Sequence, residues 1–247
     1  MEPISPYAPR PVRRPVMLQR WQNLTFLHWR YEPGIIGRML PQGLQVDTFE
    51  GYAWVGLTPF VLYNLRVPFT PAAPWISRFP ETNVRTYVKG PDGERGVWFF
   101  TLEADRLLAV LAARAIYHLP YRWAAMRVRQ CGEQIVEYQS RRKRPFAPAQ
   151  TDIAIRRGER IVSGPFDNFL TARYRLYTTV GKQTAFADID HEPWSLHTGT
   201  VLRLQQNLVQ RCELPPPVGE PTVHVSIDLA VRIGRLQLFA KRPVRIS

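Results

Sequence analysis

Apolar and polar residues alternate along much of this chain with the two-residue period of β-strands. The alternation is clearest at residues 79–88, where Glu81, Asn83, Arg85 and Tyr87 occupy every second position. Their side chains leave one side of a pleated strand, while small β-branched residues occupy the other side. An acid, an amide, a base and a phenol in one row fit either a solvated strand face or the wall of a polar pocket.

About a dozen segments share this alternation or are rich in β-branched and aromatic residues, which predicts strands. Residues 201–209 fit a strand or a helix. Pro91-Asp92-Gly93 is a turn signal that predicts a hairpin between two neighbouring strands. The expected strands are 23–31, 46–49, 51–60, 61–65, 79–88, 96–103, 122–130, 133–142, 151–157, 173–179, 184–189, 223–231 and 235–239.

Helical periodicity is confined to a few places. Apolar residues recur at helical spacing after Asp105, the expected N-cap, and the helix should end before Pro120. Shorter helices are expected at 35–40 and 165–171, and the proline-rich segment 67–79 predicts a long loop. Together these elements predict a mainly β fold of antiparallel strands with a few covering helices.

The 247 residues are enough for one large β-rich domain. We expect a flexible arm at 1–16, rich in proline and arginine, and a single domain at 17–247. No apolar run approaches the ~18 residues that span a bilayer, and the arm lacks the apolar core of a secretory signal. Cys131 and Cys212 are too few for a disulfide scaffold, so a reducing cytoplasm is the simplest compartment.

Basic residues outnumber acidic ones by 33 to 20, giving a formal charge of +13. This charge favours anionic partners, whether nucleic acid, acidic lipid or carboxylate metabolites. The dense run Arg141–Arg144 is expected at a strand end or turn. Because the other arginines are scattered and no nucleic-acid-binding motif is present, nucleic acid is the less favoured partner. Proline-rich edges and seven tryptophans leave a homo-oligomer open.

Several familiar site motifs are missing from the sequence. It has no glycine-rich phosphate loop, no dinucleotide fingerprint and no Gly-x-Ser-x-Gly nucleophile motif. The five histidines do not follow metal-ligand spacing. We therefore predict neither a metal nor a cofactor.

Six sequence blocks carry a family resemblance that extends over roughly residues 17–240. In this order and spacing they resemble the YqjF-like family, a set of uncharacterised bacterial proteins. The resemblance implies the fold of acetoacetate decarboxylase, a cone-like, incomplete double β barrel that encloses a polar pocket. The blocks are Leu27–Trp29, Leu40–Leu44, Gly51–Leu57, Glu81–Val88, Gly96–Phe100 and Leu119–Tyr121.

The resemblance breaks at the reactive lysine of acetoacetate decarboxylase, which forms a Schiff base. The lysine motif of that enzyme, an arginine followed by Gly-aromatic-Pro-Lys-Lys, falls on residues 114–122, with Pro120 in place of its proline. Tyr121 then stands at the Schiff-base position and Arg122 at the second lysine. A phenol cannot form an imine, so decarboxylation by that route is not expected.

Other pocket positions of the related enzyme are retained. The resemblance places Arg30 at its substrate-facing arginine and Glu81 at a pocket glutamate. A second pocket glutamate falls near residues 57–58, where this chain has no acid.

Such a pocket would suit acid–base chemistry on a small oxo acid, as in a lyase, hydratase or isomerase. Glu81 is the candidate general base, and Tyr121 the candidate donor to an oxyanion. The alternatives are a ligand sensor without catalysis and a protein that binds anionic surfaces or nucleic acid. The candidates for substrate contact are Arg30 or Arg85 for a carboxylate, Arg114 as a brace or stabilising charge, and Trp98 as a wall.

Overall fold

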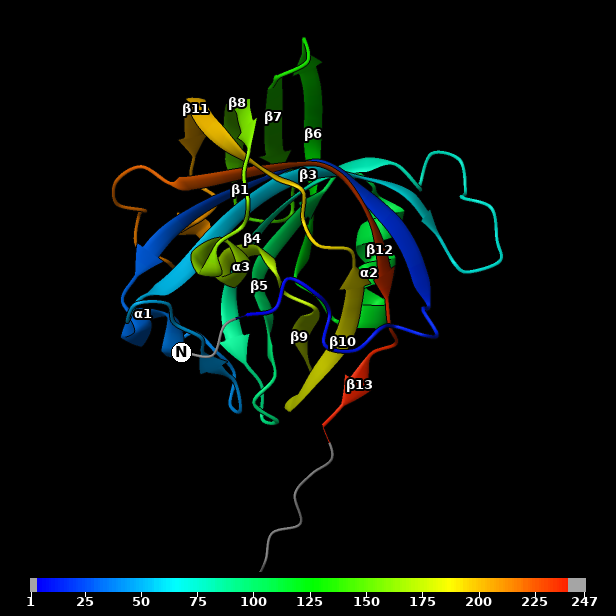
Figure 1. Ribbon diagram of the computed structural model, residues 1–247. Helices are drawn as coiled ribbons and strands as arrows, with labels where there is room; N and C mark the ends of the chain where they lie inside the picture. The colour runs from blue at the N-terminus through cyan, green and yellow to red at the C-terminus, as the bar shows by residue number, and fades with distance from the viewer. Residues whose placement is uncertain (1–3, 240–247) are drawn as a thin grey trace, which may run out of the picture.

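Thirteen strands join into one continuous sheet in the computed structural model, which describes residues 4–239 (Figure 1). Three α-helices lie against this sheet within the same range. The elements are β1 (Met17–Tyr31), α1 (Pro33–Gly37), β2 (Gln45–Val46), β3 (Ala53–Arg66), β4 (Phe79–Lys89), β5 (Arg95–Ala104), α2 (Leu107–Tyr117), β6 (Tyr121–Cys131), β7 (Ile135–Arg142), β8 (Gln150–Arg160), α3 (Pro165–Thr171), β9 (Arg175–Val180), β10 (Gln183–His191), β11 (Leu196–Gln206), β12 (Thr222–Ile233) and β13 (Gln237–Leu238).

Two additional strand pairings close the sheet on itself. The strand order is β13-β10-β9-β5-β6-β7-β8-β11-β12-β1-β3-β4-β2, and β10 also pairs with β12 while β5 pairs with β4. The long strands β1, β3 and β4 are therefore shared by two connected rings, one completed by β9 and β10 and the other by β6 to β8 and β11. The predicted mainly β class and double-barrel architecture are confirmed. Most pairings are antiparallel, but β5 runs parallel to both β6 and β9.

The individual elements follow the sequence closely, and several of them differ in their bounds; β1, for example, begins at Met17 and not at residue 23. Residues 201–209 belong mostly to strand β11, and the two strands expected at 51–65 form the single strand β3. Asp105 is not the N-cap of α2, because Arg106 occupies that position and Asp105 pairs with its guanidinium at 2.8 Å. The turn at Gly93 forms as expected, with φ of +80°.

Segments at both chain ends extend beyond the strands. Part of the predicted arm, residues 1–3, and the last part of the predicted domain, residues 240–247, lie outside the described residues. Residues 4–16 contact the barrel, where the Val12 amide donates to Asp190 and the Val16 amide to the Ile233 carbonyl. Within residues 4–239, no helix is long and apolar enough to cross a bilayer.

The interior of each ring is filled by apolar side chains. Tyr138, Ile153 and Leu27 belong to the cluster under β7 and β8, and Phe169 and Leu176 to the cluster around α3. Each large apolar side chain contributes about 1.5–3 kcal/mol when it is fully buried. The interior also holds ion pairs, among them Arg142 Nη2 at 2.7 Å from Glu103 Oε1. Arg142 comes from the basic run Arg141–Arg144, so this run does not act as one exposed patch.

Irregularities in two strands determine which side chains face the interior of the ring that contains β9 and β10. In β5, Val84 of β4 is opposite Thr101 and Arg85 is opposite Phe99, so Phe100 is an extra residue in the ladder. In β1, Asn23 has φ of +49° and the register with β3 shifts at this point. An inserted residue reverses the alternation that follows it. Phe99 and Leu102 therefore both face inward, whereas a regular strand would turn one of them away.

Candidate functional site

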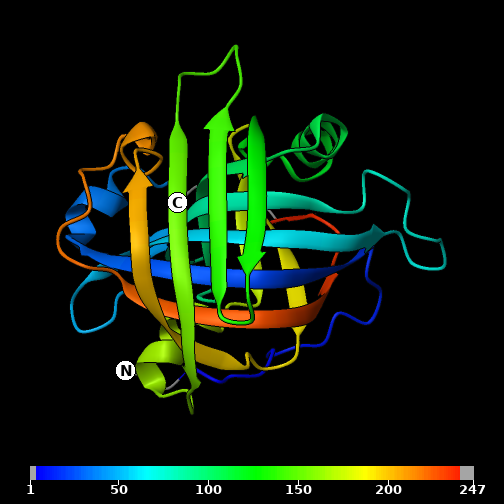
Figure 2. The same ribbon diagram turned by 90° about the horizontal axis from the view of Figure 1, so that it is seen from above.

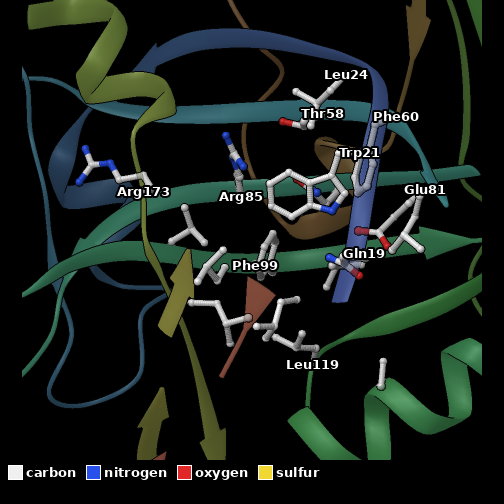
Figure 3. Close-up of a pocket in the computed structure, with 18 of the residues that line it drawn as sticks. Gln19, Trp21, Leu24, Thr58, Phe60, Glu81, Arg85, Phe99, Leu119 and Arg173 are labelled. Carbon is white, nitrogen blue, oxygen red and sulfur yellow. The ribbon is translucent and has the colours of Figure 1, made fainter. Parts of the chain in front are cut away.

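A cavity of about 100 Å³ lies inside the ring that contains β9 and β10 (Figure 3). This volume is several times the ~10–15 Å³ that one water molecule needs, so a small organic molecule fits. Strands β1, β3, β4 and β5 form much of the wall, and α2 and the segment after α3 complete it. Most of the wall is apolar, through residues such as Leu24, Phe60, Phe99, Leu102 and Leu119.

The polar row of β4 forms part of this wall. Glu81, Asn83 and Arg85 all line the cavity, and each is less than one-tenth exposed. Tyr87, the fourth member, is fully buried beyond the cavity, where its hydroxyl contacts His28 and the Leu170 carbonyl. The row is therefore a pocket wall and not a solvated strand face.

Glu81 and Tyr121 form a hydrogen-bonded acid pair. The Tyr121 hydroxyl donates to Glu81 Oε2 at 2.8 Å. Burial raises the pKa of Glu81 to about 7, although the Tyr121 hydroxyl and the Asn83 amide both oppose this rise. Burial also raises the pKa of Tyr121 well above its ordinary value, and the nearby Glu81 carboxylate adds to the shift. Tyr121 therefore stays protonated while Glu81 titrates near neutral pH.

Arg85 is a buried cation without an acidic partner among the described residues. Its guanidinium packs over the Phe26 ring at 5.0 Å and the Tyr87 ring at 5.8 Å. Its Nε and Nη2 atoms are buried and have no hydrogen-bond acceptor. A desolvated charge is costly unless it is paired. Three other cavity groups have unpartnered buried polar atoms, namely Trp21 Nε1, Thr58 Oγ1 and Asn83 Oδ1.

The second arginine of the cavity wall is already paired. Arg173 donates to Asp47 Oδ2 at 2.6 Å and also to the Phe169 carbonyl. Its charge is thus balanced within the fold, in contrast to that of Arg85. Figure 3 shows the two arginines on the same side of the cavity and Glu81 on the opposite side.

Two histidines next to the site are held in the neutral form. Burial, followed by the charge of Arg85, lowers the pKa of His28 well below its ordinary value. Burial lowers the pKa of His191 to about 4, and its Nδ1 lies 2.7 Å from the Glu192 carbonyl. In neutral His191 the Nδ1 proton is donated to this carbonyl, which leaves Nε2 as an acceptor. His191 lines the cavity.

Three residues expected to contact substrate lie elsewhere. Arg30 is exposed, and its guanidinium lies over the rings of Tyr52 and Trp54. It lies outside the cavity because Leu24 is the last residue of β1 that lines the wall. The structure thus corrects the pocket position that the family resemblance implied for Arg30.

Arg114 and Trp98 are also absent from the cavity wall. Arg114 is on the outer side of α2, over the Phe146 ring, while Ala113 and Tyr117 face inward. Trp98 packs in a separate cluster, because in β5 it precedes the extra residue and alternates with Phe99.

Several groups that the fold brings to the cavity were not predicted from the sequence. Trp21 was missed because β1 begins at Met17, earlier than predicted. For Thr58 the one available signal was the family resemblance, which implied a second pocket acid near residues 57–58. His191 had no local signal, since it reaches the cavity from a distant strand. Within residues 4–239, no group of three His, Cys, Asp or Glu side chains could hold a metal ion.

Comparison with known proteins assigns the family. The profile of a family named DUF2071 and described as an uncharacterized conserved protein matches residues 18–230. The chain belongs to the DUF2071 family. It is 37% identical over 218 residues to the uncharacterized protein YqjF of Bacillus subtilis strain 168, covering 85% of this chain and 87% of YqjF. The predicted YqjF-like membership is confirmed.

Solved structures with similar folds support the predicted architecture of this DUF2071 protein. An acetoacetate decarboxylase-like enzyme from Sphingomonas wittichii RW1 matches with a TM-score of 0.65 and 12% identity, over 94% of this chain and 96% of that one. The enduracididine biosynthesis enzyme MppR, complexed with pyruvate, matches at 0.64 and 10%, over 92% and 91%. Acetoacetate decarboxylase from Legionella pneumophila matches at 0.62 and 13%, over 94% and 92%. At these identities the likeness concerns the fold alone.

We predict that Glu81 makes stability depend on pH. The pKa of Glu81 is about 7 in the folded state against an ordinary value of 4.5, so the folded state binds the proton more tightly. The contribution of Glu81 to stability is therefore greatest below about pH 4.5 and is lost as the pH rises through 7. As the pH rises between these limits, the free energy of unfolding of Glu81→Gln should increase by about 3 kcal/mol relative to that of wild type, at ~1.4 kcal/mol per pKa unit.

The measurement is urea unfolding of both proteins across this pH range. Glu220→Gln, at an exposed glutamate, serves as the matched control and should show no such trend. A stability difference between wild type and Glu81→Gln that stays constant with pH would contradict the raised pKa.

Proposed function

We propose that this DUF2071 protein binds a small oxo acid in the cavity and transfers a proton on it by acid–base chemistry, without a Schiff base. The observation that carries the proposal is the unpaired, buried guanidinium of Arg85 in the same cavity as Glu81, whose pKa is near 7. The first group favours a carboxylate ligand, and the second can exchange a proton with it at neutral pH.

Arg85 is the group that would hold the carboxylate. Its free Nε and Nη2 atoms lie on one edge of the guanidinium, the edge that donates two parallel hydrogen bonds to a carboxylate. Such an ion pair would compensate for the desolvation of the cation. Arg173 cannot take this role without breaking its ion pair with Asp47.

Glu81 would perform the proton transfer, and Tyr121, whose hydroxyl donates to Glu81 Oε2, would orient its carboxylate. The Glu81 carboxylate would accept a proton from the carbon next to the ligand carbonyl, and the electrons of that C–H bond would move to the carbonyl oxygen. The enolate oxygen needs hydrogen-bond donors, and Trp21 Nε1 and Thr58 Oγ1 are unpartnered in the same cavity. This step is common to isomerases, hydratases and some lyases.

Two further observations support this proposal. No lysine among the described residues lines the cavity, so imine chemistry has no amine there. Lys89 lies near Asp47, and Lys143 covers the Trp123 ring. In addition, MppR, which shares the fold, has been solved with pyruvate, a small oxo acid.

Ligand binding provides the first test. We expect calorimetry to find a ligand for the wild type among carboxylic acids of increasing length that carry an oxo group on the α or the β carbon. Arg85→Met should weaken its binding by about 2–5 kcal/mol, because the ligand carboxylate would lose a charged partner in a buried site. The same substitution should raise the melting temperature of the unliganded protein, because it removes an unpaired buried charge.

Arg30→Met is the matched control, since Arg30 was the other sequence candidate and lies outside the cavity. It should leave binding unchanged. Retained affinity in Arg85→Met, or lost affinity in Arg30→Met, would overturn the assignment of the carboxylate site.

Proton exchange provides the second test. In D₂O, the protein should catalyse deuterium uptake at the carbon next to the ligand carbonyl, measured by NMR, with a rate that rises as the pH passes about 7. Glu81→Gln should slow uptake by about 10²–10⁴-fold, the usual contribution of a general base. Tyr121→Phe should move the midpoint to higher pH, because the Tyr121 hydrogen bond lowers the pKa of Glu81.

Borohydride added with the ligand should leave the chain unlabelled, and a labelled lysine would contradict the absence of a Schiff base. Binding that depends on Arg85 without any exchange would identify a ligand sensor in place of an enzyme. Exchange at an undiminished rate in Glu81→Gln would show that another group is the base.

A further inference from the structure

One face of the molecule outside the cavity is both apolar and basic. Its centre is the outer side of α2, and it continues onto the β3–β4 loop, residues 67–78, and the β7–β8 loop, residues 143–149. Figure 2 shows α2 between these two loops at the edge of the barrel. We call this surface the α2 face. Its exposed apolar residues are Val67, Phe69, Trp75, Ile76, Leu107, Leu108, Leu111 and Ile116.

The helix itself is apolar on both sides. Val110 and Tyr117 are buried against the barrel, and Ala113 faces the cavity. On the other side, Leu108 and Leu111 are more than half exposed. Arg114 is the only charged residue in α2. A helix that is apolar all round normally lies in an apolar environment, whereas the outer side of α2 is exposed to solvent.

The β3–β4 loop presents two aromatic side chains in a strained conformation. Phe69 and Trp75 have φ of +66° and +65°, a region that residues other than glycine rarely adopt. Phe69 is nevertheless fully exposed and Trp75 is 87% exposed, so packing within the chain does not compensate for this strain. Arg106 Nε donates to the Trp75 carbonyl at 2.7 Å, which fixes the loop against the start of α2.

The charges of the α2 face have one sign. Segments 67–78 and 106–118 contain three arginines and no aspartate or glutamate, and the adjacent Asp105 is paired with Arg106. The β7–β8 loop adds Lys143 and Arg144. This loop packs against α2, because the guanidinium of Arg114 lies over the Phe146 ring at 5.8 Å. A second copy of the chain would bring the same positive charge against this face, whereas an anionic partner would be attracted.

We propose that the α2 face docks on an anionic lipid bilayer. Phe69, Trp75 and the exposed leucines would enter the boundary between headgroups and acyl chains, where aromatic and apolar side chains are favoured. The arginines and Lys143 would contact lipid phosphates, with their aliphatic stems along the apolar surface. This inference does not depend on the oxo-acid chemistry of the cavity.

Vesicle co-sedimentation of the full chain tests the proposal. We expect binding to vesicles of phosphatidylcholine mixed with phosphatidylserine, weaker binding to phosphatidylcholine alone, and release as salt is raised. Phe69→Ser with Trp75→Ser should weaken binding at least about tenfold through lost apolar burial. Arg114→Gln with Arg144→Gln should remove most of the difference between the two lipid compositions. Arg142 is left unchanged, since it is paired internally with Glu103.

The matched control is Val162→Ser with Val218→Ser, at exposed apolar residues outside the α2 face. It should bind vesicles as wild type does. Equal loss in this control, equal binding to both lipid compositions, or no vesicle binding by the wild type would overturn the proposal. A second result would also overturn it: a wild type that binds no vesicles but sediments as a dimer, with the dimer lost in Phe69→Ser with Trp75→Ser. The α2 face would then contact a second copy of the chain.

Discussion

The guanidinium of Arg85 is buried with no carboxylate of residues 4–239 beside it, and the site is arranged around this charge. His28 stays neutral next to it, and the charge of Arg173 is balanced by Asp47. Arg85 is therefore the cavity arginine whose charge is not balanced by an acidic side chain of residues 4–239. A fold that retains such a cation gives up stability, which is typical of a binding site and not of a structural ion pair.

The four-residue separation of Glu81 and Arg85 keeps their roles distinct. On an extended strand it places their Cα atoms about 13 Å apart. A closer arginine would favour the charged form of Glu81 and lower its pKa. Burial dominates instead, and the pKa of Glu81 rises to about 7. In the proposed reaction, Arg85 at one end of the cavity would hold the ligand carboxylate and Glu81 at the other end would exchange a proton with it.

Local patterns predicted the strand that carries the site, but not the whole site. Period-two alternation was sufficient to place Glu81, Asn83 and Arg85 on one face, because β4 itself is regular. Trp98 was assigned to the wrong side because the extra residue in β5 changes the alternation, and one sequence does not reveal such a bulge. His191 and Trp21 reach the cavity through closure of the barrel, which local patterns do not encode.

The family resemblance had a similar limit. It identified the fold and the positions of Glu81 and Tyr121, which the structure brings to 2.8 Å. It also implied a pocket position for Arg30, whereas the arginines that line the cavity are Arg85, four residues along the same strand as Glu81, and Arg173. The resemblance transferred positions from a lysine-based enzyme, and the cation of this cavity comes from the DUF2071 chain's own strand pattern.

The most direct test of this account is a crystal structure with an unreactive oxo-acid analogue. The ligand carboxylate should accept two hydrogen bonds from Nε and Nη2 of Arg85, at about 2.7–2.9 Å. The carbon next to its carbonyl should lie toward Glu81, and no bond to a lysine should be present. An analogue bound elsewhere, with this edge of Arg85 still free, would contradict the account.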